Sequence, residues 1–121
     1  MLFERKWTQM NFKNLISKVF GNTKRISGEI TLNEAEQIIR KNSNVILLDV
    51  RSMQEYKEYH INGAICIPNY EIQSRVEKEI PNKESVVIIY CQSGIRSKKV
   101  VTIMRKLGYR NIFHISNGLN G

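Results

Sequence analysis

One short segment of this 121-residue chain gathers residue types that could carry out chemistry on an anion. It follows the apolar run 86–90 and reads Cys91-Gln92-Ser93-Gly94-Ile95-Arg96-Ser97. Gly94 permits a tight turn in which successive backbone N–H groups point at one place. A helix that starts behind the turn adds partial positive charge, and we expect Ser97 to cap it. The segment therefore predicts an anion-binding loop.

Cys91 is the residue of this loop that could act as a nucleophile. The backbone turn, the helix N-terminus and the Arg96 guanidinium would each favour its thiolate, which lowers a thiol pKa from the ordinary value of about 8.5. A thiolate among N–H donors can attack a substrate and then hold the anionic group transferred to it. The alternative is a buried, unreactive cysteine at a strand end, which is common for free cysteines.

Alternating strands and helices must hold this loop in place. Runs that are apolar throughout are typical of strands buried on both faces, and they lie at 45–48, 64–67 and 86–90. A last strand is predicted at 111–115. Helices are predicted between them, at 31–39, 52–59, 72–80 and 97–107. Capping-box pairs begin the first two helices: Thr31 with Glu34, and Ser52 with Glu55.

This alternation predicts an α/β fold of three layers, with a mostly parallel sheet and helices on both faces. In such folds ligands bind beyond the carboxyl ends of the strands. The rule points to the loops after Leu48, Tyr90 and Ile115, and the second of these is the cysteine loop.

The composition suits one folded domain, with 41% hydrophobic and 25% charged residues. It contains no run of the roughly 18 apolar residues that a membrane span needs. The net charge is +8, and half of it lies in residues 1–30, which hold six basic and two acidic side chains. This excess favours anionic partners. The charge alone does not choose among small oxyanions, acidic proteins, nucleic acid and lipid surfaces, although we expect no nucleic acid partner.

Residues 1–28 form a basic arm that precedes the predicted domain of residues 29–121. Apolar side chains recur in it at helical spacing, at Phe12, Leu15, Ile16, Val19 and Phe20. Such a helix could contact a membrane surface or a protein partner. The alternative is a helix that docks on its own domain, or a terminus without fixed order.

Two cysteines and no apolar signal sequence make the cytoplasm the expected compartment. Cys66 could be a resolving thiol for Cys91, giving a redox cycle, but its apolar surroundings favour a buried core position. His114 has no cysteine or second histidine at metal-ligand spacing, so we expect neither a metal site nor a cofactor.

The segment from Cys91 to Ser97 resembles the C-x-x-G-x-R active-site loop of rhodanese-like sulfurtransferases. A second signature of that family is similar to parts of this chain in the same order: Asp49-Val50-Arg51, Glu55-Tyr56, His60-Ile61-Asn62-Gly63-Ala64 and Ile67-Pro68. Near residue 118, Asn117-Gly118 resembles a degenerate form of the family's closing Gly-Gly. The similarity covers about residues 28–121.

The resemblance implies a rhodanese-like fold whose Cys91 accepts a sulfane sulfur from thiosulfate or a persulfide. The acceptor, cyanide in an assay or a thiol in the cell, then removes it. Backbone N–H groups of the loop would hold the transferred sulfur, and these belong to Gln92, Ser93, Gly94, Ile95, Arg96 and Ser97. Arg96 would also orient the anionic donor and hold the loop, while Asp49 and Arg51 would support the loop from the edge of the site.

Two other functions stay open. A phosphatase or arsenate reductase on the same fold has a longer C-x5-R loop, whereas four residues separate Cys91 from Arg96 here, which makes a smaller cradle. A non-catalytic binding module is the alternative from another class, although this chain keeps the cysteine, glycine and arginine of the loop.

Overall fold

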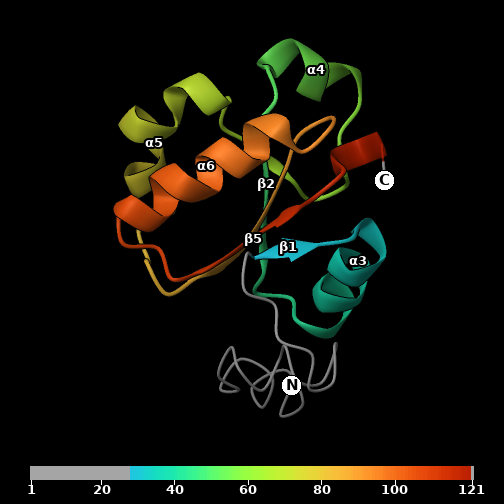
Figure 1. Ribbon diagram of the computed structural model, residues 1–121, viewed down its shortest axis with the longest axis horizontal. Helices are drawn as coiled ribbons and strands as arrows, with labels where there is room; N and C mark the ends of the chain where they lie inside the picture. The colour runs from blue at the N-terminus through green and yellow to red at the C-terminus, as the bar shows by residue number, and fades with distance from the viewer. Residues whose placement is uncertain (1–27, 121) are drawn as a thin grey trace.

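A parallel five-stranded sheet forms the middle layer of the computed structural model, which describes residues 28–120 (Figure 1). Its strands are β1 Glu29–Ile30, β2 Ile46–Asp49, β3 Ile65–Cys66, β4 Val86–Tyr90 and β5 Asn111–Ile115. They lie in the order β1-β5-β4-β2-β3, and each neighbouring pair is parallel. The predicted parallel sheet is confirmed.

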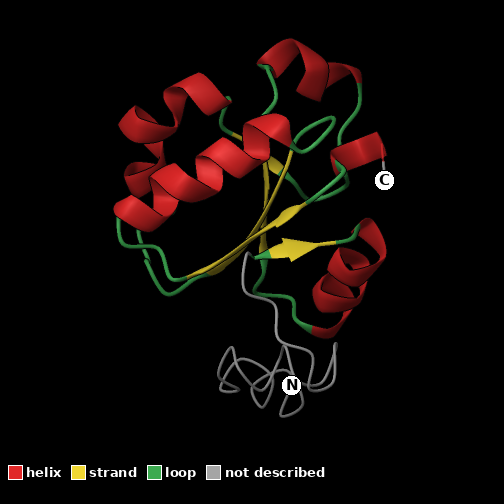
Figure 2. Cartoon of the chain, in the orientation of Figure 1, coloured by secondary structure: helices red, strands yellow, loops and turns green. Residues whose placement is uncertain are grey.

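Helices cover both faces of this sheet, as Figure 2 shows in red around the yellow strands. One face is covered by α3 (Leu32–Lys41), and the other by α5 (Ile72–Glu79) and α6 (Ile95–Lys106). The short α4 (Met53–Glu58) buries no residue, and two single turns complete the order: η1 (Asn69–Glu71) and η2 (Gly118–Asn120). The three-layer α/β architecture is therefore as predicted.

Both predicted capping boxes form. The Thr31 hydroxyl oxygen accepts from Glu34 N at 3.0 Å, and the Glu34 carboxylate accepts from Thr31 N at 2.9 Å. Ser52 and Glu55 make the same reciprocal pair, at 3.1 and 3.0 Å. Each pair satisfies two backbone donors that a helix start leaves without partners, which fixes where α3 and α4 begin.

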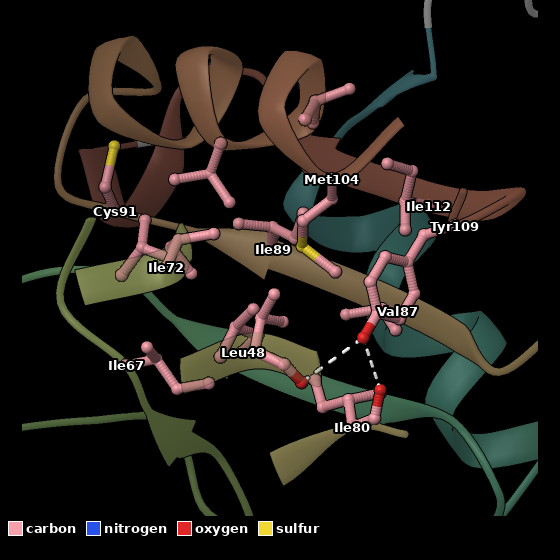
Figure 3. Packing of buried hydrophobic residues seen from close by; sticks show 14 residues of the cluster. Leu48, Ile67, Ile72, Ile80, Val87, Ile89, Cys91, Met104, Tyr109 and Ile112 are labelled. Atoms are coloured by element: carbon pink, nitrogen blue, oxygen red, sulfur yellow. Dashed lines mark hydrogen bonds between the residues drawn. The ribbon is translucent and has the colours of Figure 1, made fainter. Parts of the chain in front are cut away.

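The core consists of two clusters, one on each face of the sheet. Alternate residues of β4 divide between them: Val87 and Ile89 join the α5/α6 side, and Ile88 and Tyr90 join the α3 side. This division explains why the strand is apolar throughout. On the α5/α6 side the Tyr109 hydroxyl donates to the Ile80 carbonyl oxygen, so its one polar atom is satisfied (Figure 3).

The structure differs from the sequence-based expectations at two elements. Strand β1 was not predicted, because two residues are too short to show a pattern; Glu29 pairs with His114 of β5. Helix α6 begins at Ile95, two residues before the predicted start at Ser97. The arm of residues 1–28, with its predicted helix, lies outside the described residues except for Gly28. Within residues 28–120, no helix has the length and apolarity to cross a membrane.

Candidate active site

The loops that follow β2, β4 and β5 meet at one edge of the sheet, because these strands are neighbours. Val50 N donates to the Tyr90 carbonyl at 3.0 Å, which joins the ends of β2 and β4. Leu119 N donates to the Cys91 carbonyl at 3.1 Å, which joins the segment after β5 to the cysteine loop. The three loops to which the sequence pointed therefore lie together at the carboxyl ends of their strands.

Gly94 makes the turn of the cysteine loop possible. It is the N-cap of α6 and has φ +96°, a conformation that favours glycine. A Cβ on this residue would clash with the carbonyl oxygen of Ser116. The turn is therefore closed by a backbone contact with the segment after β5, as well as by its own geometry.

The Cys91 sulfur lies inside this turn and points at the start of α6 (Figure 3). It accepts hydrogen bonds from Gly94 N at 3.1 Å and from Ser97 N at 3.4 Å, and it lies 3.6 Å from Ser97 Oγ. Burial alone would raise the pKa of the Cys91 thiol. The donors from Ser97 and Gly94 outweigh burial and hold that pKa below its ordinary value.

Ser97 does not cap the helix, which corrects the sequence-based expectation. The turn at Gly94 lets α6 begin early, so Ser97 lies in its first turn with its side chain buried. Its hydroxyl lies 3.2 Å from the Gly94 carbonyl and 3.0 Å from His114 Nδ1. Ser97 therefore connects the cysteine sulfur to a buried histidine of β5, a residue that the sequence analysis considered only as a metal ligand.

Arg96 is held by an acidic residue of α4. Its two terminal nitrogens lie 2.8 and 3.1 Å from the carboxylate oxygens of Glu55. The Arg96 hydrogen bonds lower the pKa of the Glu55 carboxyl to about 2. The guanidinium therefore ties α4 to the loop, in agreement with the expectation that Arg96 holds the loop. Its expected role in orienting an anionic donor stays a prediction. The expectation missed this partner because Glu55 lies 41 residues earlier.

Asp49 and Arg51 form a buried ion pair, with Arg51 Nη2 2.8 Å from Asp49 Oδ2 and exposed fractions of 4% and 0% for arginine and aspartate. Arg51 also donates to the Tyr59 carbonyl, and its guanidinium carbon lies 5.8 Å from the centroid of the Tyr90 ring. These contacts connect the end of β2 to the end of α4. The pair thus forms at the end of β2, where the resemblance placed it. The implied support of the cysteine loop by these two residues stays a prediction.

The remaining loop side chains face solvent. Gln92, Ser93 and Ile95 are exposed, and Gln92 Nε2 donates to Asn120 Oδ1 at 2.8 Å. Asn120 N donates to the Gln92 carbonyl at 3.1 Å. A Cβ at Gly118 would clash with the Cys91 carbonyl oxygen, so η2 packs directly on the loop backbone. The sequence signal for this contact was the Asn117-Gly118 pair.

Cys66 is a buried core residue, as expected. Burial raises the pKa of its thiol to about 11. Strand β2 lies between β3, which carries Cys66, and β4, which Cys91 follows. Two strand spacings are about 10 Å, beyond the roughly 7 Å that a disulfide allows between Cα atoms. The geometry therefore disfavours Cys66 as a disulfide partner for Cys91.

Among residues 28–120, no group of three or more acidic, histidine or cysteine side chains could hold a metal.

A parallel α/β sheet with a cysteine in a short N–H-lined loop, at the carboxyl end of a central strand, defines a class of protein. The chain belongs to the rhodanese-like domain family, which it matches over residues 31–121.

Within the family, the chain is similar to YrkF of Bacillus subtilis (strain 168), named as a sulfur carrier protein, with 32% identity over 91 residues. It is also 34% identical over 65 residues to the thiosulfate sulfurtransferase PspE of Escherichia coli (strain K12). These matches cover 75% and 54% of this chain but only 48% and 62% of the relatives, so the chain spans about half the length of the first and three fifths of the second.

Solved structures show the same fold. SSP1007 of Staphylococcus saprophyticus superimposes with a TM-score of 0.69 at 29% identity, over 76% of this chain and 89% of that one. A rhodanese from E. coli, described with anions, has a TM-score of 0.58 at 32% identity, over 63% and 88% of the two chains.

Proposed function

We propose that this protein is a sulfurtransferase that carries a sulfane sulfur as a persulfide of Cys91. The observation that carries the proposal is the Cys91 sulfur itself, which receives N–H donors from Gly94 and Ser97. Such donors stabilise a thiolate before the reaction and the negative charge of a persulfide after it. The sulfurtransferase and the sulfur carrier among the relatives support the same chemistry.

The cycle has two displacement steps at sulfur. The Cys91 thiolate attacks the outer sulfur of thiosulfate, a bond forms between the two sulfurs, and the S–S bond of thiosulfate breaks as sulfite leaves with the electron pair. A thiolate or cyanide acceptor then attacks the outer sulfur of the persulfide. The Cys91 thiolate leaves with the bonding pair, so the enzyme returns to its starting state.

Access to the sulfur requires movement of the loop. Cys91 has no exposed surface, whereas Gln92, Ser93 and Ile95 beside it are exposed. We infer that these residues move aside when a donor enters. Small reagents such as methyl methanethiosulfonate should therefore modify Cys91 much faster than bulky aromatic disulfides, and unfolding should abolish the difference. Equal rates in the folded protein would contradict this view of access.

The test of the function is the intact mass of the reduced protein after incubation with thiosulfate. The protein should gain one sulfur atom, and cyanide should remove it as thiocyanate. Cys91→Ser should gain none, whereas the matched control Cys66→Ser should behave like the parent, because Cys66 is a core residue. If the parent gains no sulfur from thiosulfate or from glutathione persulfide while its thiol is free, the sulfurtransferase proposal is wrong and the binding-module alternative gains support.

A further inference from the structure

Three buried side chains from different elements form a line that ends at the Cys91 sulfur. His114 of β5 places Nδ1 3.0 Å from the Ser97 hydroxyl of α6, and this hydroxyl lies 3.6 Å from the sulfur. His114 is 3% exposed, and Ser97 and Cys91 are fully buried. A polar side chain buried in a core costs free energy unless it has a hydrogen-bonding partner. Each of these three side chains has its partner within the line.

The direction of the His114 side chain follows from strand alternation. Ile112 belongs to the core cluster under α5 and α6, while Phe113 and Ile115 belong to the cluster under α3. Because alternate residues of a strand face the same side, His114 points toward α6. Its far nitrogen, Nε2, lies 3.6 Å from Oε2 of Glu29, which pairs with it across strands β1 and β5.

The Ser97 hydroxyl has one proton and more than one acceptor. When Cys91 is a thiol, the S–H can donate to Ser97 Oγ, and the Ser97 proton can go to His114 Nδ1 or to the Gly94 carbonyl. When Cys91 is a thiolate, the best use of the Ser97 proton is donation to the sulfur. That arrangement is strongest when His114 Nδ1 carries a proton and donates to Ser97 Oγ.

We propose that His114 is a positioning residue that exchanges a proton with Cys91 through the Ser97 hydroxyl, so that the ionisation of thiol and imidazole is coupled. In this step the thiol proton moves to Ser97 Oγ while the Ser97 proton moves to His114 Nδ1. A neutral thiol and a neutral imidazole become a thiolate and an imidazolium, and the total charge is unchanged. The inference rests on the proposed role of Cys91 as the nucleophile.

The charged groups around His114 allow its side chain to be either a neutral imidazole or an imidazolium. Burial lowers the pKa of His114, and Lys98 and Arg105 of α6 lower it further, whereas Glu29 of β1 raises it. The imidazole is therefore available as a neutral proton acceptor near neutral pH. The Glu29 carboxylate, which is 42% exposed, supplies the opposite charge that an imidazolium needs at that position.

Coupling predicts a particular pH dependence for alkylation of Cys91. An imidazolium near the sulfur stabilises the thiolate, so the alkylation rate should stop falling over the acid range in which His114 gains its proton. A lone thiol shows no such plateau, because its rate falls steadily with its thiolate fraction. The experiment uses the Cys66→Ser protein and iodoacetamide, with intact mass as the readout.

His114→Asn keeps a hydrogen-bonding group beside Ser97 but cannot take up a proton. We expect it to lose the plateau and to react about ten-fold or more slowly at the acid end, as expected for removing a charge about 6 Å away. His60→Asn is the matched control, because the chain has two histidines and His60 stacks on Tyr56 instead. It should keep the plateau. If His114→Asn and His60→Asn give the same profile, the proposal is wrong.

A second measurement needs no variant at His114. Thermodynamic linkage makes the coupling reciprocal. If protonation of His114 lowers the pKa of Cys91, ionisation of Cys91 must raise the pKa of His114 by the same amount. Nitrogen-15 NMR of the two imidazoles should show the His114 titration moving to lower pH once Cys91 is carboxamidomethylated, because the modified sulfur can no longer become the thiolate that stabilises the imidazolium. The His60 signals serve as the internal control and should be unaffected by the modification. An unmoved His114 titration would overturn the proposal. A coupled protein that forms no persulfide would instead refute only the proposed function.

Discussion

The carboxylate of Glu55 lies against the guanidinium of Arg96, with 2.8 Å between Oε1 and Nη1 and 3.1 Å between Oε2 and Nη2. Each side chain is one third exposed. Glu55 also accepts from Ser52 N, so the same carboxylate begins α4 and ties that helix to the cysteine loop. The position of the loop thus depends on a residue far from it in sequence.

Glu55→Gln should weaken both the fold and the reaction. The variant loses the negative charge that holds Arg96. A partly exposed ion pair of this kind stabilises the fold by about 1 kcal/mol. If the loop depends on this pair, the rate of thiocyanate formation should fall about five-fold, the factor that corresponds to that free energy. Glu58→Gln removes an equal charge from an exposed position of the same helix and is the control. Similar losses in both variants would show that only net charge matters.

The stabilising effect of Glu55 should depend on pH in a defined window. Its pKa is about 2 in the folded protein against an ordinary 4.5, so the folded state binds fewer protons than the unfolded state between these values. The difference in unfolding free energy between the parent and Glu55→Gln should be constant above about pH 4.5. It should shrink as the pH falls toward 2. Urea unfolding of both proteins across this range provides the measurement, and a pH-independent difference would contradict the ion pair.

Gly94→Ala should damage the site more than a comparable change elsewhere. Gly94 and Gly63 both have positive φ angles, of 96° and 89°, but a Cβ at Gly63 meets no atom within 4 Å. Gly63→Ala should therefore cost only the backbone conformation, about 1–2 kcal/mol. Gly94→Ala adds the clash with Ser116 and should cost more, with loss of persulfide formation. Thermal unfolding and the mass assay compare the two, and equal costs would contradict the role given to the Ser116 contact.

Asp49→Asn should be strongly destabilising, because it leaves the Arg51 guanidinium buried without its counter-charge. Breaking one side of a buried ion pair typically costs about 3–5 kcal/mol. Glu36→Gln provides the contrast, since the Glu36–Arg40 pair is more than half exposed on both sides and should change stability by less than about 1 kcal/mol. Chemical denaturation of the two variants tests this, and a small effect of Asp49→Asn would mean that water reaches Arg51.

Local sequence patterns predicted the framework well. The capping residues Thr31 and Ser52 set the starts of two helices, and the apolar run Val86–Tyr90 became the central strand with the predicted bounds. These features depend on interactions within a few residues or on burial from both faces. The donors around Cys91 could be predicted for the same reason, because they belong to one continuous turn.

Contacts between distant segments were the part that the sequence did not reveal. The partner of Arg96 depends on how α4 sits over the loop, which no local pattern encodes. His114 is a different case, because alternation along β5 already placed it on the same face as Ile112. What could not be foreseen was that the first turn of α6 would place Ser97 beside it, which depends on the early start of that helix at Ile95.

The donors that face the Cys91 sulfur from Gly94 and Ser97 are peptide N–H groups, which every residue except proline carries. Side chains at exposed positions such as Ser93 and Ile95 can therefore be exchanged without removing those donors. Selection can then change these exposed side chains to suit a new sulfur donor or acceptor while the reactivity of the cysteine persists. A loop built in this way separates what the protein recognises from what it does, and that separation makes it adaptable.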